Sequence, residues 1–338
     1  MGTVTEEESA EQQQHNSQVI IEMLRGDEVN DRIAAAYKLK DVAAVIGGER
    51  TRKELLPFLS ESVDDEDEVL VVLAESLGDL VPFVGGEEYV HVLLPLLEML
   101  LTAEEGTVRQ KAVQSTHTVM DSLSYNDFNL KYVSMVKRLA TKEWFTARMS
   151  SCYLLAPNFD RLMDDRREAH VKLFASLCRD EVPMVRRVAA QNFGNFVHEV
   201  VSSCGISTIH KNGLVSKYIL PLYSTLASND QDSVRLHTPT NCISFGSEFV
   251  PLLSNANNEE KKIIEDAINT HILPLLISVS NDSEWRVRWT AASKFAEAVK
   301  AFSTFNGAVE SLIPAYEKLL KDSDSEVSFN FECILFEQ

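Results

Sequence analysis

The most prominent feature of the chain is a pattern of apolar and polar positions that recurs along it. Within residues 271–292, an apolar segment containing Pro274 is followed by an acidic turn at Asp282, and Val287 and Arg288 then begin a second segment with small residues. Apolar residues at helical spacing predict a helix on each side of the turn. This unit is therefore predicted to be a helical hairpin.

The same pattern recurs in register with two markers. The position of Val287, which we call the valine slot, is occupied in turn by Asp31, Val69, Val108, Ala147, Val185, Val234, Val287 and Val327. A proline precedes five of these slots by 12 or 13 residues, namely Pro57, Pro95, Pro221, Pro274 and Pro314. Periods near 40 residues are typical of two-helix solenoid repeats. The sequence predicts an all-α protein, a right-handed α-solenoid of about eight antiparallel helix pairs, with each proline kinking a first helix.

The repeats predict one continuous array that follows a short tail. Residues 1–15 are expected to form a flexible acidic tail, and residues 16–338 the solenoid. The expected repeats are about 16–48, 49–86, 87–125, 126–164, 165–202, 213–252, 258–305 and 306–338. The last is incomplete and ends in apolar residues, among them Phe329, Phe331, Ile334, Leu335 and Phe336. End repeats of a solenoid normally carry a polar outer face, so a sticky C-terminal end is expected.

Composition and charge narrow the class of protein. Hydrophobic residues make up 45% of the chain, enough for a continuous core, and the formal net charge is -19. Nucleic acid is therefore not expected as a partner, because binding its phosphates needs dense Lys and Arg. No stretch approaches 18 consecutive apolar residues, and the acidic N-terminus does not resemble a signal peptide, so no membrane association is expected.

The sequence contains no recognisable motif for catalysis or metal binding. The five scattered cysteines lack C-x-x-C spacing and are expected to be free thiols in a reducing compartment, which favours a cytoplasmic and also a nuclear location. The acidic turns at residues 64–68 and 322–326 lack the glycine and terminal glutamate of a calcium loop. No phosphate-binding, zinc-protease or hydrolase motif is present. We expect no enzymatic activity, no metal and no cofactor.

Charged residues of the turns follow the same register. Acidic residues lie five positions before four valine slots, at Asp64, Asp180, Asp282 and Asp322. Arginines directly follow five slots, at Arg109, Arg148, Arg186, Arg235 and Arg288. Stacked repeats would bring the two sets together as a charge ladder between neighbouring turns. We expect this ladder to be mainly structural, with exposed pairs contributing about 0–1 kcal/mol each.

Other turn residues are better candidates for contact with a partner. A solenoid displays the side chains of successive turns along one ridge, and Trp and Arg are enriched in interface hot spots. The candidate contact residues, which we call the turn ridge, are Glu104, Trp144, Phe145, Asp180, Pro183, Met184, Arg187, Trp285 and Arg286. For Trp285, the alternative to contact with a partner is packing against the adjacent turn. Trp289, inside the following helix, is expected to be buried.

Several segments resemble one known family in the same order along the chain. They include ERTRKELLPFLSE, VGGEEYVHVLLPLLE, DEVPMVRRVAA, LASNDQDSVRL and SEWRVRW. These segments are similar to those of the scaffolding A subunits of protein phosphatase 2A, which are HEAT-repeat proteins, and the resemblance covers residues 20–327. It implies a non-catalytic scaffold whose N-terminal repeats dock a regulatory B subunit through turns such as those of Trp144, Pro183, Arg187, Trp285 and Arg286. It also implies that the C-terminal repeats of a full-length family member hold the catalytic subunit.

The chain has only about eight repeats, so we expect it to bind the regulatory B subunit. The catalytic subunit would be a partner only of the full-length family member. The alternative is a HEAT-repeat transport receptor or another protein-binding adaptor. A transport receptor would bind a basic localisation peptide or a small GTPase, and an enzyme would show turnover as a purified chain.

Overall fold

The computed structural model describes residue 15, residues 17–61 and residues 63–328. Across these residues the chain is helical and contains no strand, which confirms the all-α prediction. It forms two compact units, Met1–Leu154 and Leu155–Gln338. The tail predicted for residues 1–15, except His15, and the apolar C-terminal residues from Phe329 onward lie outside the described residues.

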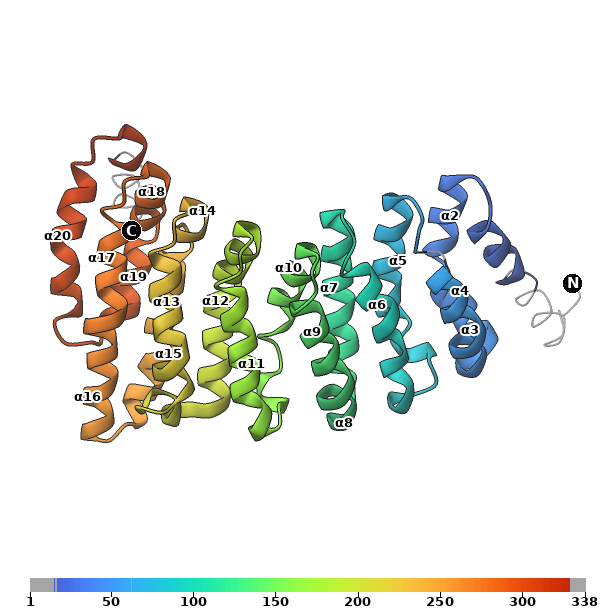
Figure 1. Ribbon diagram of the computed structural model, residues 1–338, viewed down its shortest axis with the longest axis horizontal. Coiled ribbons are helices and arrows are strands. Elements are labelled where there is room, and N and C mark those ends of the chain that lie inside the picture. The colour runs from blue at the N-terminus through green and yellow to red at the C-terminus, as the bar shows by residue number, and fades with distance from the viewer. Residues whose placement is uncertain (1–14, 16, 62, 329–338) are drawn as a thin grey trace, which may run out of the picture. The chain divides into compact units, whose positions relative to one another are not determined.

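The first unit consists of successive helix pairs, with residues 17–24 also helical (Figure 1). Its α-helices are α2 (Val29–Ala36), α3 (Leu39–Arg50), α4 (Leu56–Glu61), α5 (Asp67–Asp79), α6 (Leu94–Leu100), α7 (Gly106–Asp121), α8 (Tyr125–Asp127), α9 (Val133–Ala140) and α10 (Phe145–Leu154). Irregular helical segments join them, namely η1 (Thr51–Leu55), η2 (Val81–Phe83), η3 (Glu87–Leu93) and η4 (Phe128–Tyr132).

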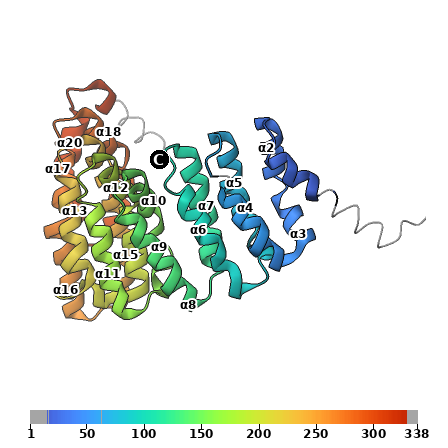
Figure 2. The same ribbon diagram turned by 45° about the vertical axis from the view of Figure 1, so that its right-hand side comes forward.

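The second helices of neighbouring pairs pack closely in the first unit. Helices α5 and α7 lie side by side, as both views show (Figure 2). The Ser115 hydroxyl donates to the Ala74 carbonyl at 2.6 Å, and a Cβ added to Gly78 would lie 3.1 Å from that hydroxyl. Valine slots Val69 and Val108 are buried beneath the turns. The small residues predicted in the second helices therefore allow close helix approach.

The second unit continues the same arrangement of helix pairs. Its α-helices are α11 (Asp164–Leu177), α12 (Pro183–Cys204), α13 (Leu220–Ala227), α14 (Asp232–Arg235), α15 (Thr238–Asn255), α16 (Asn258–Asp266), α17 (Leu273–Val279), α18 (Trp285–Ser293), α19 (Phe295–Phe302) and α20 (Ala308–Leu320). The irregular segments are η5 (Phe159–Arg161), η6 (Gly205–Ile209), η7 (Val215–Ile219) and η8 (Ala267–Ile272).

A cluster of aromatic side chains forms the core of the second unit. The ring of Phe174 on α11 stacks on that of Phe196 on α12 with centroids 4.0 Å apart. Phe193, one turn earlier on α12, contacts Tyr223 on α13 and Phe245 on α15, with centroids 6.0 and 6.1 Å away. All five side chains are fully buried. The cluster therefore joins two consecutive repeats through one contiguous apolar core.

Four of the prolines lie where the winding changes within a first helix. Pro57, Pro95, Pro221 and Pro274 each occupy the second residue of an α-helix, and each helix directly follows an irregular segment. The irregular segment before each proline is itself helical and runs directly into the α-helix, so each proline lies inside a continuous helical segment. The prediction of a proline inside the first helix is confirmed at these four sites and for Pro314 within α20. That the prolines kink these helices stays a prediction.

Proline is not required for a π-helical turn. The segment η4 has π geometry before α9, although the corresponding position of that repeat carries no proline. In the second unit, η7 and η8 have the same geometry and do precede prolines. The shared feature is a change from π to α winding within a first helix, as where η8 continues α16 and runs into α17.

His170 on α11 is a buried neutral side chain in the core of the second unit. Its Nε2 lies 2.8 Å from the carbonyl of Leu155, and its ring meets Phe159 edge-on at 5.9 Å. Burial lowers the pKa of His170 to about 4, against the backbone hydrogen bond, which raises it. The folded unit therefore resists protonation of this ring at a pH where the unfolded chain accepts it.

This environment predicts acid sensitivity of the second unit. Because the pKa of His170 is about 4 in the folded state and about 6.5 in the unfolded state, stability is lost as the pH falls from 6.5 towards 4. We expect His170 alone to lower the free energy of unfolding by about 2 kcal/mol between pH 7 and pH 5. Denaturant unfolding of wild type and His170→Gln at both pH values measures this difference. The exposed His271→Gln is the control, and an equal acid-induced loss in all three proteins would contradict the assignment.

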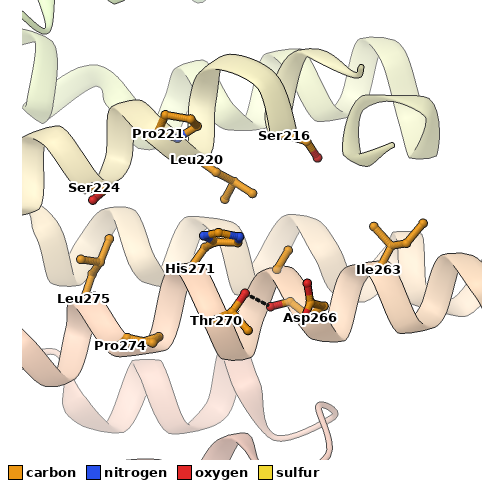
Figure 3. A pocket seen from close by; sticks show the side chains of 11 residues that line it. Ser216, Leu220, Pro221, Ser224, Ile263, Asp266, Thr270, His271, Pro274 and Leu275 are labelled. Atoms are coloured by element: carbon orange, nitrogen blue, oxygen red, sulfur yellow. Dashed lines mark hydrogen bonds between the residues drawn. The ribbon is translucent and has the colours of Figure 1, made fainter. Parts of the chain in front are cut away.

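A shallow groove of about 440 Å³ lies between first helices of the second unit. Figure 3 shows Pro221 and Leu220 of the α13 segment facing His271 and Pro274 of the η8–α17 segment. The Thr270 hydroxyl donates to the Asp266 carbonyl of its own helix at 2.6 Å. The groove belongs to the first helices, whereas every predicted contact residue lies in the turns at the helix ends.

Candidate functional site

Six of the intra-repeat turns are closed by an arginine that follows the valine slot, whereas Val69 is followed by Leu70 and Val327 by Ser328. Arg288 Nη1 donates to the carbonyls of Asp282 and Ser283 at 2.8 and 3.1 Å. Arg32, Arg109, Arg148, Arg186 and Arg235 bind the two corresponding carbonyls of their own turns. One guanidinium thus satisfies two carbonyls at the end of a first helix. These repeated hydrogen bonds make the turns well-defined platforms for the residues they display.

The charge ladder predicted from the sequence is present in the second unit. Arg235 binds Asp282 through two hydrogen bonds of 2.7 and 2.8 Å, and Arg288 binds Asp322 in the same way at 2.7 and 2.9 Å. The hydrogen bond from Arg288 lowers the pKa of Asp322, outweighing the burial that raises it. Arg186 pairs with Asp230 at 2.9 Å. Such paired forks fix neighbouring turns relative to each other within this unit.

In the first unit the ladder differs from the predicted one. Arg32 pairs with Asp65, its Nε lying 3.0 Å from Oδ1, and with Glu66, so the partner is not the predicted Asp64. The Asp65 carboxylate also accepts from the N–H of Glu66, which orients it toward Arg32. Arg32 was missed because its valine slot holds a polar residue, Asp31.

Three predicted contact residues lie in the turns of the first unit. Glu104 is exposed at the turn between α6 and α7. Trp144, at the turn before α10, is 51% exposed, and its ring lies 5.6 Å from that of Phe145, which is half-buried. The two aromatic rings therefore support each other while one face of Trp144 stays open to solvent. An exposed, supported Trp is suited to anchoring a partner.

Four predicted contact residues lie at the turn before α12. Pro183, Met184 and Arg187 are exposed, with Met184 52% exposed. Asp180 is half-buried, and its carboxylate accepts from the N–H of Val182 at 2.9 Å. Asp180 thus supports its own turn, whereas the other three residues present an apolar and basic surface at the start of α12.

The turn before α18 carries the last two predicted contact residues. Arg286 is exposed, and its guanidinium lies 4.8 Å from the centroid of the half-buried Trp285 ring. Trp289 is 39% exposed, so the prediction that it is buried is wrong. It lies one turn after Trp285 on the face opposite the buried Val287, because helical positions two apart point in nearly opposite directions. Trp289 therefore extends the exposed surface of this turn.

Comparison with known proteins identifies the family. The HEAT repeat model matches residues 171–200 and 272–302. The regulatory A subunit of protein phosphatase PP2A from Schizosaccharomyces pombe is 40% identical over 283 residues, which are 83% of this chain and 44% of that protein. The chain is a homologue of these HEAT-repeat A subunits. The Saccharomyces cerevisiae counterpart is 34% identical over 297 residues, covering 87% of this chain and 44% of that protein. The chain thus spans less than half the length of these relatives.

A human relative and a solved structure complete the comparison. The beta isoform of the human 65 kDa regulatory A subunit is 44% identical over 178 residues, covering 53% of this chain and 30% of that protein. The structure of yeast importin-beta superposes with a TM-score of 0.67 at 14% identity, covering 98% of this chain and 42% of that one. This second similarity shows the α-solenoid fold alone. It does not favour the transport-receptor alternative.

Neither a metal site nor a membrane-spanning helix is found where the structure can be described. Across residues 17–61 and 63–328, no group of three or more His, Cys, Asp or Glu could hold a metal ion. None of the described helices is both long and apolar enough to cross a bilayer. Among the described residues, Cys152, Cys178, Cys204 and Cys242 are not in disulfide bonds.

Proposed function

We propose that the chain is a non-catalytic scaffold of a protein phosphatase 2A-like holoenzyme that docks a regulatory B subunit on its turn ridge. The observation that carries this proposal is sequence similarity, at 34–40% identity over most of the chain, to proteins named as regulatory A subunits. Exposed Trp144, Met184 and Arg286, held on turns closed by arginine, support it. Large apolar and basic anchors on rigid platforms are typical of protein interfaces.

Under this proposal, the catalytic subunit is bound by a longer scaffold and not by this chain alone. In a scaffold that binds two proteins, assembly is favoured because the second binding event becomes intramolecular. This chain matches 44% of the length of its relatives, which supports assigning it one of the two docking regions. We propose that it binds a regulatory subunit, does not by itself hold the catalytic subunit, and acts in the cytosol or nucleus.

Affinity capture with separate subunits tests this function. The purified chain is immobilised and offered a regulatory B subunit or the catalytic subunit of protein phosphatase 2A, and a full-length scaffold of the family serves as the positive control for both. Retention of only the regulatory subunit is the expected result. Stoichiometric capture of the catalytic subunit, or no capture of any regulatory subunit, would refute the proposal.

A further inference from the structure

One arginine of the first unit, Arg109, occupies a ladder position without an acid in the ladder position of the following turn. In the ladder pairs Arg235–Asp282 and Arg288–Asp322, the acidic residue lies in the turn of the following repeat. Within the described residues, Arg109 has no carboxylate partner of this kind. Its Nη1 binds the carbonyls of Ala103 and Glu104 in its own turn. The remaining donors of this guanidinium are therefore not used by the ladder.

The position that should hold the acid is occupied by Lys142. Arg148 Nη1 donates to the Lys142 carbonyl at 2.9 Å, just as Arg288 Nη1 donates to the Asp282 carbonyl at 2.8 Å. Lys142 and Asp282 thus have the same place in their turns, and Lys142 belongs to the repeat that follows Arg109. A cation replaces the carboxylate that the ladder geometry requires.

The two turns that carry these cations are in contact. The Thr146 hydroxyl on α10 donates to the carbonyl of Thr102 at 2.9 Å, and Ser150 donates to the Leu101 carbonyl at 2.8 Å. These bonds join the start of α10 to the turn before α7. Glu105 interacts with Arg109 electrostatically but forms no ladder pair with it, and its Oε1 accepts from both the N–H and the hydroxyl of Thr107.

The surroundings of Arg109 and Lys142 are suited to a protein partner. Arg109 is half-buried, while Lys142 and Trp144 are exposed on the turn ridge. A half-buried guanidinium in one turn and an exposed aromatic ring in the adjoining turn are the kinds of group that position a charged side chain of a partner. The chain carries a net charge of -19, so two cations in adjoining turns, Arg109 and Lys142, differ in sign from the charge of the chain as a whole.

We propose that Arg109 and Lys142 form a receptor for a carboxylate side chain, Asp or Glu, of the docked regulatory subunit, which completes the ladder in trans. The proposal rests on the proposed function and adds the chemistry of one contact. The partner carboxylate replaces the acid that the scaffold supplies to itself at Asp282 and Asp322. Docking then pairs Arg109 with the partner carboxylate, which also offsets the repulsion between Arg109 and Lys142.

The substitution Lys142→Asp tests this contact because it supplies the missing acid within the chain. The new carboxylate pairs with Arg109 and repels the partner carboxylate, so the affinity for the regulatory subunit is expected to fall about tenfold or more. The melting temperature is expected to stay the same or rise. Lys137→Asp, an exposed site on α9 of the same repeat, is the matched control with the same charge change, and its affinity is expected to change less than twofold.

The outcomes separate the contact from the function. If the wild-type chain binds no regulatory subunit, the proposed function fails. If wild type binds and Lys142→Asp binds equally well, the carboxylate receptor is overturned while the scaffold function stands. Should Lys142→Asp unfold, Lys142→Ala decides, with a several-fold loss expected and no loss contradicting the proposal. If Lys142→Asp weakens self-association of the chain and leaves regulatory-subunit binding unchanged, the proposal is also overturned, because the partner at Arg109 and Lys142 would then be a second copy of the chain.

Discussion

Replacing Phe196 with alanine is expected to lower the free energy of unfolding of the second unit by about 4 kcal/mol. Phe196 is fully buried, stacks on Phe174 at 4.0 Å and meets Phe159 edge-on at 6.0 Å. Truncation removes both ring contacts and leaves a cavity that the surrounding helices fill only in part. Because each repeat contacts only its neighbours, the damage is expected to concentrate in α11 and α12.

Hydrogen exchange and denaturant unfolding measure this effect together. Amides of α11 and α12 should exchange faster in Phe196→Ala, while those of the first unit keep their protection. Phe196→Leu, which retains most of the buried volume, should cost about 1.5 kcal/mol or less and serves as the control. An unchanged unfolding midpoint in Phe196→Ala would show that the aromatic cluster does not hold these repeats together.

Replacing both Trp285 and Arg286 with alanine is expected to weaken regulatory-subunit binding by about 2 kcal/mol or more, roughly 30-fold. The guanidinium of Arg286 lies over the Trp285 ring, so the two side chains form one amphipathic surface. Truncating them removes a supported aromatic anchor together with a charge. Isothermal titration calorimetry of the two proteins with a regulatory subunit measures the loss.

A matched pair away from the turn ridge distinguishes this effect from a general one. Tyr125 is 52% exposed on α8, and Lys131 on the neighbouring η4 is exposed as well. Tyr125→Ala with Lys131→Ala likewise removes an aromatic and a basic group, but outside the intra-repeat turns. Its affinity should match that of wild type. Equal affinity in wild type and the Trp285 and Arg286 double variant would refute the assignment of this turn to the interface.

Periodicity predicted the helix pairs and the ladder because both are repeated many times. The valine slots Val69, Val108, Val185 and Val287 are all buried, as a slot beneath a turn requires. Where an arginine follows the slot, it binds the same two carbonyls of its turn, a role fixed by spacing within the turn. A pattern shared by several repeats can be predicted from the sequence, because each copy supports the interpretation of the others.

Features that depend on one repeat were not predicted. Trp289 was expected to be buried because it is apolar and helical, yet the buried face of α18 is already occupied by Val287 and Ala291. Asp65 replaces Asp64 in the ladder because local turn geometry decides which neighbouring carboxylate faces Arg32. The break at Arg109 was also missed, since Lys142 gains meaning only when the turns are superposed.

Hydrogen exchange of the chain, free and with a bound regulatory subunit, tests the central claim most directly. The account predicts slower exchange in the intra-repeat turns that carry Trp144, Met184 and Trp285. Amides lining the groove around Pro221 and His271, on the first helices, should be unaffected. Protection along those first helices, with the turns unchanged, would contradict the assignment of the turn ridge as the docking surface.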